Sequence, residues 1–93
     1  MDEKMRISNA EMKVMNQIWK AEEMVTVPEV LEILKKEGEE WTYPTVATFL
    51  RRLTAKEILG VTKKGNKLCY FPLVSKEQYE KKEAEGFVES KFG

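Results

Sequence analysis

The chain has 93 residues, of which 42% are hydrophobic and 34% charged, and its 16 basic and 16 acidic side chains give a formal net charge of zero. This composition is typical of one soluble globular domain and excludes a disordered chain. No apolar run approaches the roughly 20 residues that cross a bilayer, and no signal peptide is visible, so we expect a cytoplasmic protein. The single cysteine, Cys69, and the lack of histidine exclude a disulfide scaffold and a zinc fold.

Positive charge is concentrated in the middle third of the chain. Residues 1–40 carry ten acidic and six basic side chains, whereas residues 41–72 carry six basic side chains and one acid, Glu57. Residues 73–93 return to a net charge of −1. Because the electrostatic footprint for a phosphate backbone is local, this segregation favours a nucleic-acid-binding surface that the zero net charge hides.

Two short helices are predicted in the first half of the chain. Residues 8–11 have the Ser-x-x-Glu spacing of a capping box and precede apolar residues at helical spacing, which predicts a helix over about residues 9–21. Residues 26–29, Thr-Val-Pro-Glu, repeat the start signal, and Gly38 predicts the end of the second helix. Residues 24–26 could form a short strand between the two helices.

A third helix is predicted to begin within residues 41–44, and its two faces differ sharply. The face at spacing i, i+3, i+4 and i+7 is apolar and is predicted to lie in the core. The opposite face is small and cationic, and residues 43–56 contain no acid. A solvated helix face usually mixes glutamate and lysine, so this pattern favours a DNA-facing surface over a chance arrangement. The predicted core face consists of Val46, Phe49, Leu50 and Leu53.

The last third of the chain predicts a β-hairpin and a fourth helix. Residues 61–63 and 67–73 are rich in β-branched and aromatic side chains and flank a turn at residues 64–66. Residues 75–78 cap a helix that is predicted to run through Tyr79, Lys82, Gly86 and Phe87. The fold class is therefore mostly α with a small β-hairpin: a winged helix-turn-helix with a three-helix core, a two- or three-stranded wing and a C-terminal helix.

Candidate DNA contacts lie on the third helix and on the hairpin. Threonine can hydrogen-bond to bases or phosphates, and arginine can bind guanine with two hydrogen bonds. Lysines at a hairpin tip can follow a phosphate backbone or enter a minor groove, although they also protect a strand edge from aggregation. If three to five phosphates are neutralised, log affinity should fall against log salt with a slope of about −3 to −4. The candidates are Trp41, Thr42, Tyr43, Thr45, Thr48, Arg51, Arg52, Lys63, Lys64 and Lys67.

Three residues have structural alternatives to a functional role. Trp41 either seals the corner between the second and third helices or donates its indole N–H to a phosphate. Trp19 lies on the apolar stripe of the first helix and is predicted to be a core residue. Cys69 lies within a predicted strand, so a structural role is favoured over redox or metal sensing.

Residues 7–19, 41–53 and 56–59 carry a family resemblance. The most specific pattern is Thr45-Val46-x-Thr48-x-Leu50-x-Arg52-Leu53-x-x-Lys56. Over nearly its whole length the chain resembles the penicillinase and methicillin-resistance repressor family, which also includes copper-responsive repressors. The resemblance implies a homodimeric repressor that binds an inverted-repeat operator in double-stranded DNA, with one recognition helix per half-site. It implies DNA contact by Thr45, Thr48 and Arg52, whereas Arg51 is supported more by helical geometry.

The chain departs from this family in two ways. Ala47 stands where many relatives carry arginine, which leaves the operator sequence open. Relatives continue for several tens of residues into a dimerisation segment, and residues 86–93 resemble the junction that leads into it. We therefore expect a winged-helix domain over residues 1–74 and, over residues 75–93, a C-terminal helix leading to a truncated dimerisation segment. In such families, cleavage by a sensor protease or metal binding in the C-terminal part commonly relieves repression.

Two other classes of function compete with a DNA-binding repressor. The first is a winged-helix protein-interaction module that docks a partner through Tyr70, Phe71 or the fourth helix and does not bind DNA. The acid-free third helix disfavours it. The second is an enzyme, but no histidine, no nucleophile with an adjacent base and no phosphate-binding loop are visible in the sequence. We therefore predict a protein that is not an enzyme and uses no cofactor.

Overall fold

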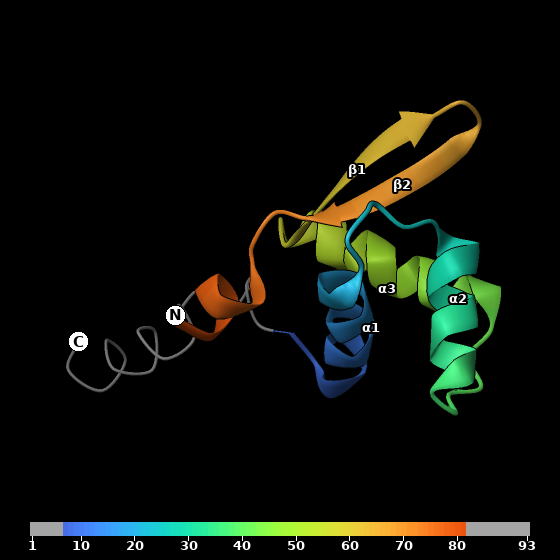
Figure 1. The fold of residues 1–93 in the computed structure, drawn as a ribbon, viewed down its shortest axis with the longest axis horizontal. Helices are drawn as coiled ribbons and strands as arrows, with labels where there is room; N and C mark the ends of the chain where they lie inside the picture. Colours follow the sequence, from blue (N-terminus) through green and yellow to red (C-terminus); the bar gives the residue numbers. More distant parts are fainter. Residues whose placement is uncertain (1–6, 82–93) are drawn as a thin grey trace.

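Three helices and a projecting β-hairpin form the fold in the computed structural model, which describes residues 7–81 (Figure 1). Residues 76–81 are also helical. No helix among these described residues is long and apolar enough to cross a membrane. The predicted mostly α fold class with a small hairpin is confirmed. In chain order the elements are α1 (Asn9–Lys20), α2 (Val27–Lys36), α3 (Tyr43–Ala55), β1 (Leu59–Lys64) and β2 (Lys67–Pro72).

Hydroxyl side chains cap all three helices at their predicted starts. Ser8 Oγ accepts the Glu11 N–H at 3.1 Å, and the Glu11 carboxylate accepts the Ser8 N–H at 2.9 Å. The same reciprocal pair begins α2 at Thr26. Thr42 begins α3, where its Oγ1 accepts the Thr45 N–H at 3.4 Å. Each such cap contributes about 1 kcal/mol and fixes the residue at which the helix begins.

Two helices end with the same backbone motif, but only one of them uses glycine. After α2, Gly38 has a φ of 88° and the next N–H, that of Glu39, donates to the Leu34 carbonyl at 2.9 Å. After α3, Glu57 has a φ of 62°, and the N–H of Ile58 donates back into the helix. The first end was predicted from its glycine. The second gives no such signal, because glutamate rarely adopts this conformation.

Replacing Glu57 with glycine should therefore stabilise the protein. A side chain in the left-handed region carries roughly 1–2 kcal/mol of strain that glycine does not, and the greater freedom of glycine in the unfolded chain offsets part of this gain. We expect Glu57→Gly to raise the free energy of unfolding in urea by about 1 kcal/mol. Glu57→Ala keeps the Cβ atom and is the control. An equal gain from both variants would mean that the carboxylate, and not the backbone conformation, is responsible.

The core lies where the three helices meet the base of the hairpin. Three of the four apolar residues predicted for the inner face of α3 are fully buried there. Phe49 differs from the prediction, because it is only half-buried and packs against the core from its edge. The fully buried aliphatic side chains are Val14, Met15, Ile18, Val30, Leu34, Val46, Leu50, Leu53, Ile58 and Leu59.

The hairpin pairs β1 and β2 antiparallel around a two-residue turn. The register ends with Lys64 opposite Lys67, so the turn consists of Gly65 and Asn66 and is one residue shorter than predicted. Gly65 has a φ of 63° at the first central position, as a type II′ turn requires. This turn matches the right-handed twist of the strands and closes the tip of the wing, the name used here for residues 59–72.

The base of the wing is attached to the segment before α2. Val25 and Tyr70 form a single antiparallel bridge, with N–H to oxygen distances of 2.9 and 2.7 Å. The short strand expected at residues 24–26 is therefore one bridge and not a strand. Since both residues are buried, the bridge ties β2 to the helical core beside the start of α2.

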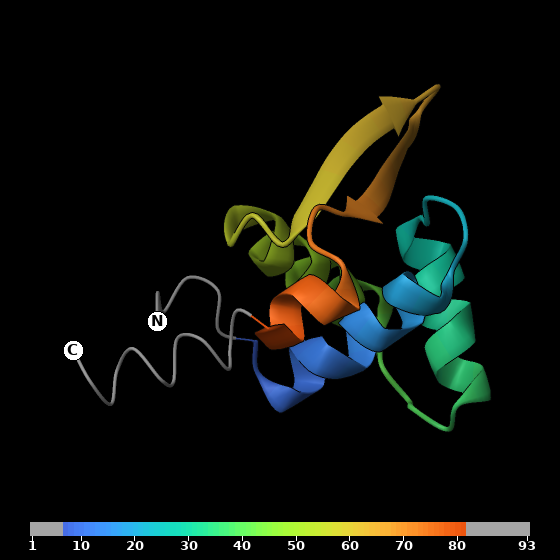
Figure 2. The ribbon, with the colours of Figure 1, turned by 60° about the vertical axis from the view of Figure 1, so that its left-hand side comes forward.

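Residues 76–81 pack beside α1, as Figure 2 shows with the two segments in orange and blue. The predicted cap at Ser75 is present. Tyr79 is buried, and its hydroxyl accepts the Ile7 N–H at 3.3 Å. Trp19, predicted as core, is half-buried and packs against the core, and its indole N–H donates to the Val74 carbonyl at 2.9 Å. The rest of the predicted fourth helix, including Lys82, Gly86 and Phe87, lies outside the described residues.

Candidate nucleic-acid interface

The outward face of α3 carries the threonines and arginines that its helical periodicity predicts there. Thr45, Arg51 and Arg52 are exposed, and Thr48 is partly exposed. The helix has no acid along its length, and its first turn, where an acidic side chain would stabilise a helix, has none either. The partial positive charge at the N-terminal end of α3 is therefore not neutralised within the helix, which suits an anionic partner.

Hydrogen bonds within α3 define what its threonines can offer. The Thr48 hydroxyl donates to the Pro44 carbonyl at 2.8 Å, so its oxygen can still accept a hydrogen bond and its methyl group can contact an apolar atom. The hydroxyls of Thr42 and Thr45 lie 3.0 Å apart. Thr42 therefore has a structural role as the helix cap, while Thr45 extends the polar surface by one turn.

Arg52 and two aromatic rings form a row along one flank of α3. The guanidinium carbon of Arg52 lies 5.7 Å from the centroid of the Phe49 ring. The Phe49 ring lies 5.1 Å from the Trp41 ring, tilted by 38°. Trp41 is half-buried and packs against the core, which favours the structural alternative predicted for it. In the part of the chain that the structure describes, neither Arg51 nor Arg52 forms an ion pair with a carboxylate.

The wing brings a second group of cations to the surface. Lys64 and Lys67 are direct partners in the register, and Lys63 lies opposite Leu68. All three lysines are exposed. Two like charges directly opposite each other are unfavourable in a sheet, so the Lys64 and Lys67 pair gains from a bound anion. Both lysines line a hollow of about 660 Å³ between α2, α3 and the wing, together with the half-exposed ring of Tyr43.

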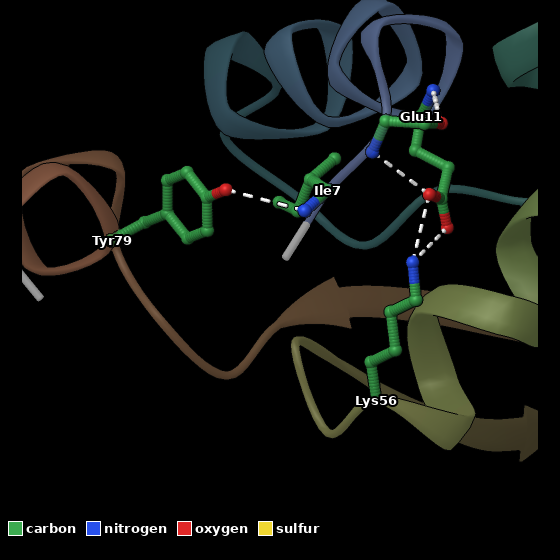
Figure 3. Close-up of polar contacts among 5 residues, drawn as sticks. Ile7, Glu11, Lys56 and Tyr79 are labelled. Carbon is green, nitrogen blue, oxygen red and sulfur yellow. Dashed lines mark hydrogen bonds and ion pairs between the residues drawn. The ribbon is translucent and has the colours of Figure 1, made fainter. Parts of the chain in front are cut away.

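Lys56 is the one cation of the basic segment that is partly buried. Its Nζ lies 2.8 Å from both carboxylate oxygens of Glu11, as Figure 3 shows. Glu11 is 3% exposed, and it also accepts the N–H of Ser8. The Lys56 charge is therefore compensated by α1. The two residues are 45 positions apart in the sequence, and each already has a local role: Glu11 in the capping box of α1 and Lys56 at the end of α3. The sequence therefore gives no indication that they form a pair.

The carboxyl group of Glu11 is ionised in this arrangement. Burial by itself raises its pKa, since it disfavours the charged form. The hydrogen bonds from Lys56 and Ser8, together with the nearby positive charge, outweigh burial and leave the pKa below its ordinary value of 4.5. The pair therefore joins the start of α1 to the end of α3 through a charge-assisted contact at neutral pH.

Among residues 7–81, no group of three or more histidine, cysteine, aspartate or glutamate side chains could hold a metal ion. The free thiol of Cys69 is buried in β2, with its sulfur 4.0 Å from the Lys67 carbonyl oxygen. This placement is in keeping with the structural role expected for Cys69. On α3 and the wing, the exposed side chains offer cationic and hydrogen-bonding groups.

A three-helix core followed by a hairpin, with a basic third helix, defines a winged helix-turn-helix protein. A family model described as penicillinase repressor matches residues 7–93. The curated penicillinase repressor of Bacillus licheniformis is 32% identical to the chain over 83 residues, which are 89% of this chain and 63% of the relative. The chain belongs to the penicillinase repressor family, as the resemblance of its motifs indicated, and it spans less than two thirds of that relative's length.

Two solved structures are similar in both fold and sequence. The DNA-binding domain of the repressor BlaI superposes with a TM-score of 0.71 and 34% identity, covering 85% of this chain and 94% of that domain. The monomeric form of Bacillus licheniformis BlaI in complex with the blaP half-operator gives a TM-score of 0.65 and 35% identity, with 80% and 88% covered. The second of these proteins was thus solved on DNA.

Proposed function

We propose that this chain is the DNA-binding part of a cytoplasmic transcriptional repressor, and that α3 and the wing bind one half of an inverted-repeat operator. The observation that carries the proposal is the exposed, acid-free face of α3, with Thr45, Thr48 and Arg52 on it. Family membership and the similarity to BlaI bound to its half-operator support it. A protein-interaction module is not favoured, because it gives no reason for this face.

The proposed binding mode follows from the geometry of the two surfaces. A helix with small residues on its outer face can enter the major groove, where Thr48 and Arg52 would reach base edges. The exposed lysines of the wing, Lys63, Lys64 and Lys67, would then lie along the phosphate backbone beside the helix. The bridge between Val25 and Tyr70 holds β2 against the same core on which α3 packs.

We also propose that the complete repressor acts as a homodimer. In a dimer, binding of the first winged-helix domain to an inverted repeat raises the effective concentration of the second domain into the mM range. A single domain should therefore bind weakly. In this proposal residues 75–93 lead from the winged-helix domain, residues 1–74, toward the dimerisation segment. Relief of repression by a sensor protease or by metal binding would act outside the surface formed by α3 and the wing.

The salt dependence of DNA binding tests the proposal. Duplexes enriched by the chain from a random library should share a sequence motif, and fluorescence anisotropy should give a log–log salt slope of about −3 to −4 on them. The slope follows from three to five neutralised phosphates, and α3 and the wing together offer five exposed cations, Arg51, Arg52, Lys63, Lys64 and Lys67. A shuffled duplex is the control. DNA recognition would be contradicted if no motif were enriched and if the affinity for DNA did not change with salt concentration.

A further inference from the structure

We infer that Phe49, backed by Trp41, is a positioning residue that holds the guanidinium of Arg52 ready to read a base. This inference rests on the proposed function and deepens it, because it separates the two neighbouring arginines of α3. Of these two arginines, Arg52 becomes the one that determines specificity. Arg51, which has no cation–π partner among the described residues, is left to neutralise phosphate.

The first step is the contact between Phe49 and Arg52. Residues three apart are neighbours on a helix surface, and the separation of 5.7 Å between the guanidinium carbon and the ring centroid is within the range of cation–π attraction. The ring face attracts the cation, while the N–H groups in the plane of the guanidinium remain free to donate. The contact therefore orients Arg52 without neutralising its charge, whereas a carboxylate partner would neutralise it.

The second step is the rigidity of the ring. Phe49 is half-buried and packs against the core, and the Trp41 ring lies 5.1 Å away on the segment that precedes α3. Trp41 also packs against the core. Phe49 is thus held by the helix that carries it, by the core and by Trp41. The part of the ring that stays outside the core lies beside the side chain of Arg52.

The third step is the consequence for binding. A free arginine side chain loses rotamer entropy when it is fixed on a base. A guanidinium already held over a ring loses less, so its contact with the correct base is stronger. Base reading requires a fixed geometry, whereas a contact with a phosphate tolerates several. Loss of the ring should therefore weaken binding to the enriched duplex and leave binding to the shuffled duplex unchanged.

A double-mutant cycle on the two duplexes tests this inference. We expect Phe49→Leu to weaken binding to the enriched duplex about 3- to 10-fold. The affinity for the shuffled duplex should stay within about two-fold of the wild-type value. In the Arg52→Ala background, Phe49→Leu should have no further effect. Phe49→Tyr, which keeps the ring, should retain wild-type affinity. Equal losses from Phe49→Leu with and without Arg52 would overturn the inference, because the ring would then act independently of Arg52.

A measurement without DNA keeps the test decisive where a variant folds less well. The Arg52 side-chain protons of the wild-type chain should show upfield ring-current shifts in NMR spectra, and Phe49→Leu should abolish them. Ordinary shifts in the wild-type chain would also overturn the inference. The proposed function fails in a different way: the wild-type chain would then bind the enriched and the shuffled duplex equally, with no dependence on salt. An Arg52→Ala variant that keeps wild-type affinity for the enriched duplex would overturn the inference alone.

Discussion

Lys56→Met should lower the free energy of unfolding by about 2–3 kcal/mol and leave the salt slope of DNA binding unchanged. The substitution keeps most of the side-chain stem but leaves the Glu11 carboxylate buried without its cation. Breaking a fully buried ion pair costs roughly 3–5 kcal/mol, and the smaller value reflects a Lys56 side chain that is 26% exposed. Urea denaturation and a salt titration on the enriched duplex measure the two quantities.

A wing lysine gives the opposite pattern and is the matched control. Lys63→Met should change the free energy of unfolding by less than about 0.5 kcal/mol, because Lys63 is exposed. It should reduce the magnitude of the salt slope by about 1, as expected for the loss of one phosphate contact. If Lys56→Met changed the salt slope and left stability intact, Lys56 would be a DNA-binding residue and its pairing with Glu11 would be incidental.

The same pair predicts how stability depends on pH. The pKa of Glu11 is lower in the folded protein than its ordinary value of 4.5, so the unfolded chain binds more protons in this range. The contribution of the pair is therefore complete above about pH 4.5 and is lost as the pH falls through the folded-state pKa. In Lys56→Met, burial without the cation raises the pKa of Glu11. The difference in free energy of unfolding between the wild type and Lys56→Met should thus become smaller as the pH is lowered.

Arg52→Ala should weaken binding to the enriched duplex by about 1–3 kcal/mol, or roughly 5- to 150-fold, and should affect the shuffled duplex much less. Arg52 is exposed, so the free energy of unfolding should stay close to that of the wild type. Arg51→Ala is the matched control on the same helix and should weaken binding to both duplexes by the same factor. Equal losses on the two duplexes for both variants would indicate that α3 contacts only the DNA backbone.

Much of the fold is encoded in short-range signals. Ser8, Thr26 and Thr42 begin the three helices where their side chains can bind the first free N–H groups, and Gly38 ends α2. These interactions span a few residues, so a local pattern is enough to predict them. The apolar stripe of α3 likewise follows from helical periodicity. The placement of the arginines and threonines on its outer face followed from the same periodicity.

The remaining features depend on contacts between distant residues or on strained backbone. The charge pattern alone places Lys56 among the surface cations, because no residue near it in sequence indicates its Glu11 partner on α1. After α3, Glu57 has a backbone conformation that favours glycine. Because the residue there is a glutamate, the sequence does not indicate that the helix ends. Phe49 fits the core stripe, but its ring is only half-buried and lies between Trp41 and Arg52. Each of these differences arises from tertiary packing that overrides a local preference.

The central claim is that α3 and the tip of the wing form one DNA-binding surface, and an NMR titration tests it most directly. The ¹⁵N-labelled chain is titrated with the enriched half-site duplex, and amide shift changes are mapped onto the described residues. We expect the largest changes to cluster at Thr45, Thr48 and Arg52 and at residues 63–67. Changes confined to α1 and residues 76–81, with α3 unaffected, would contradict it.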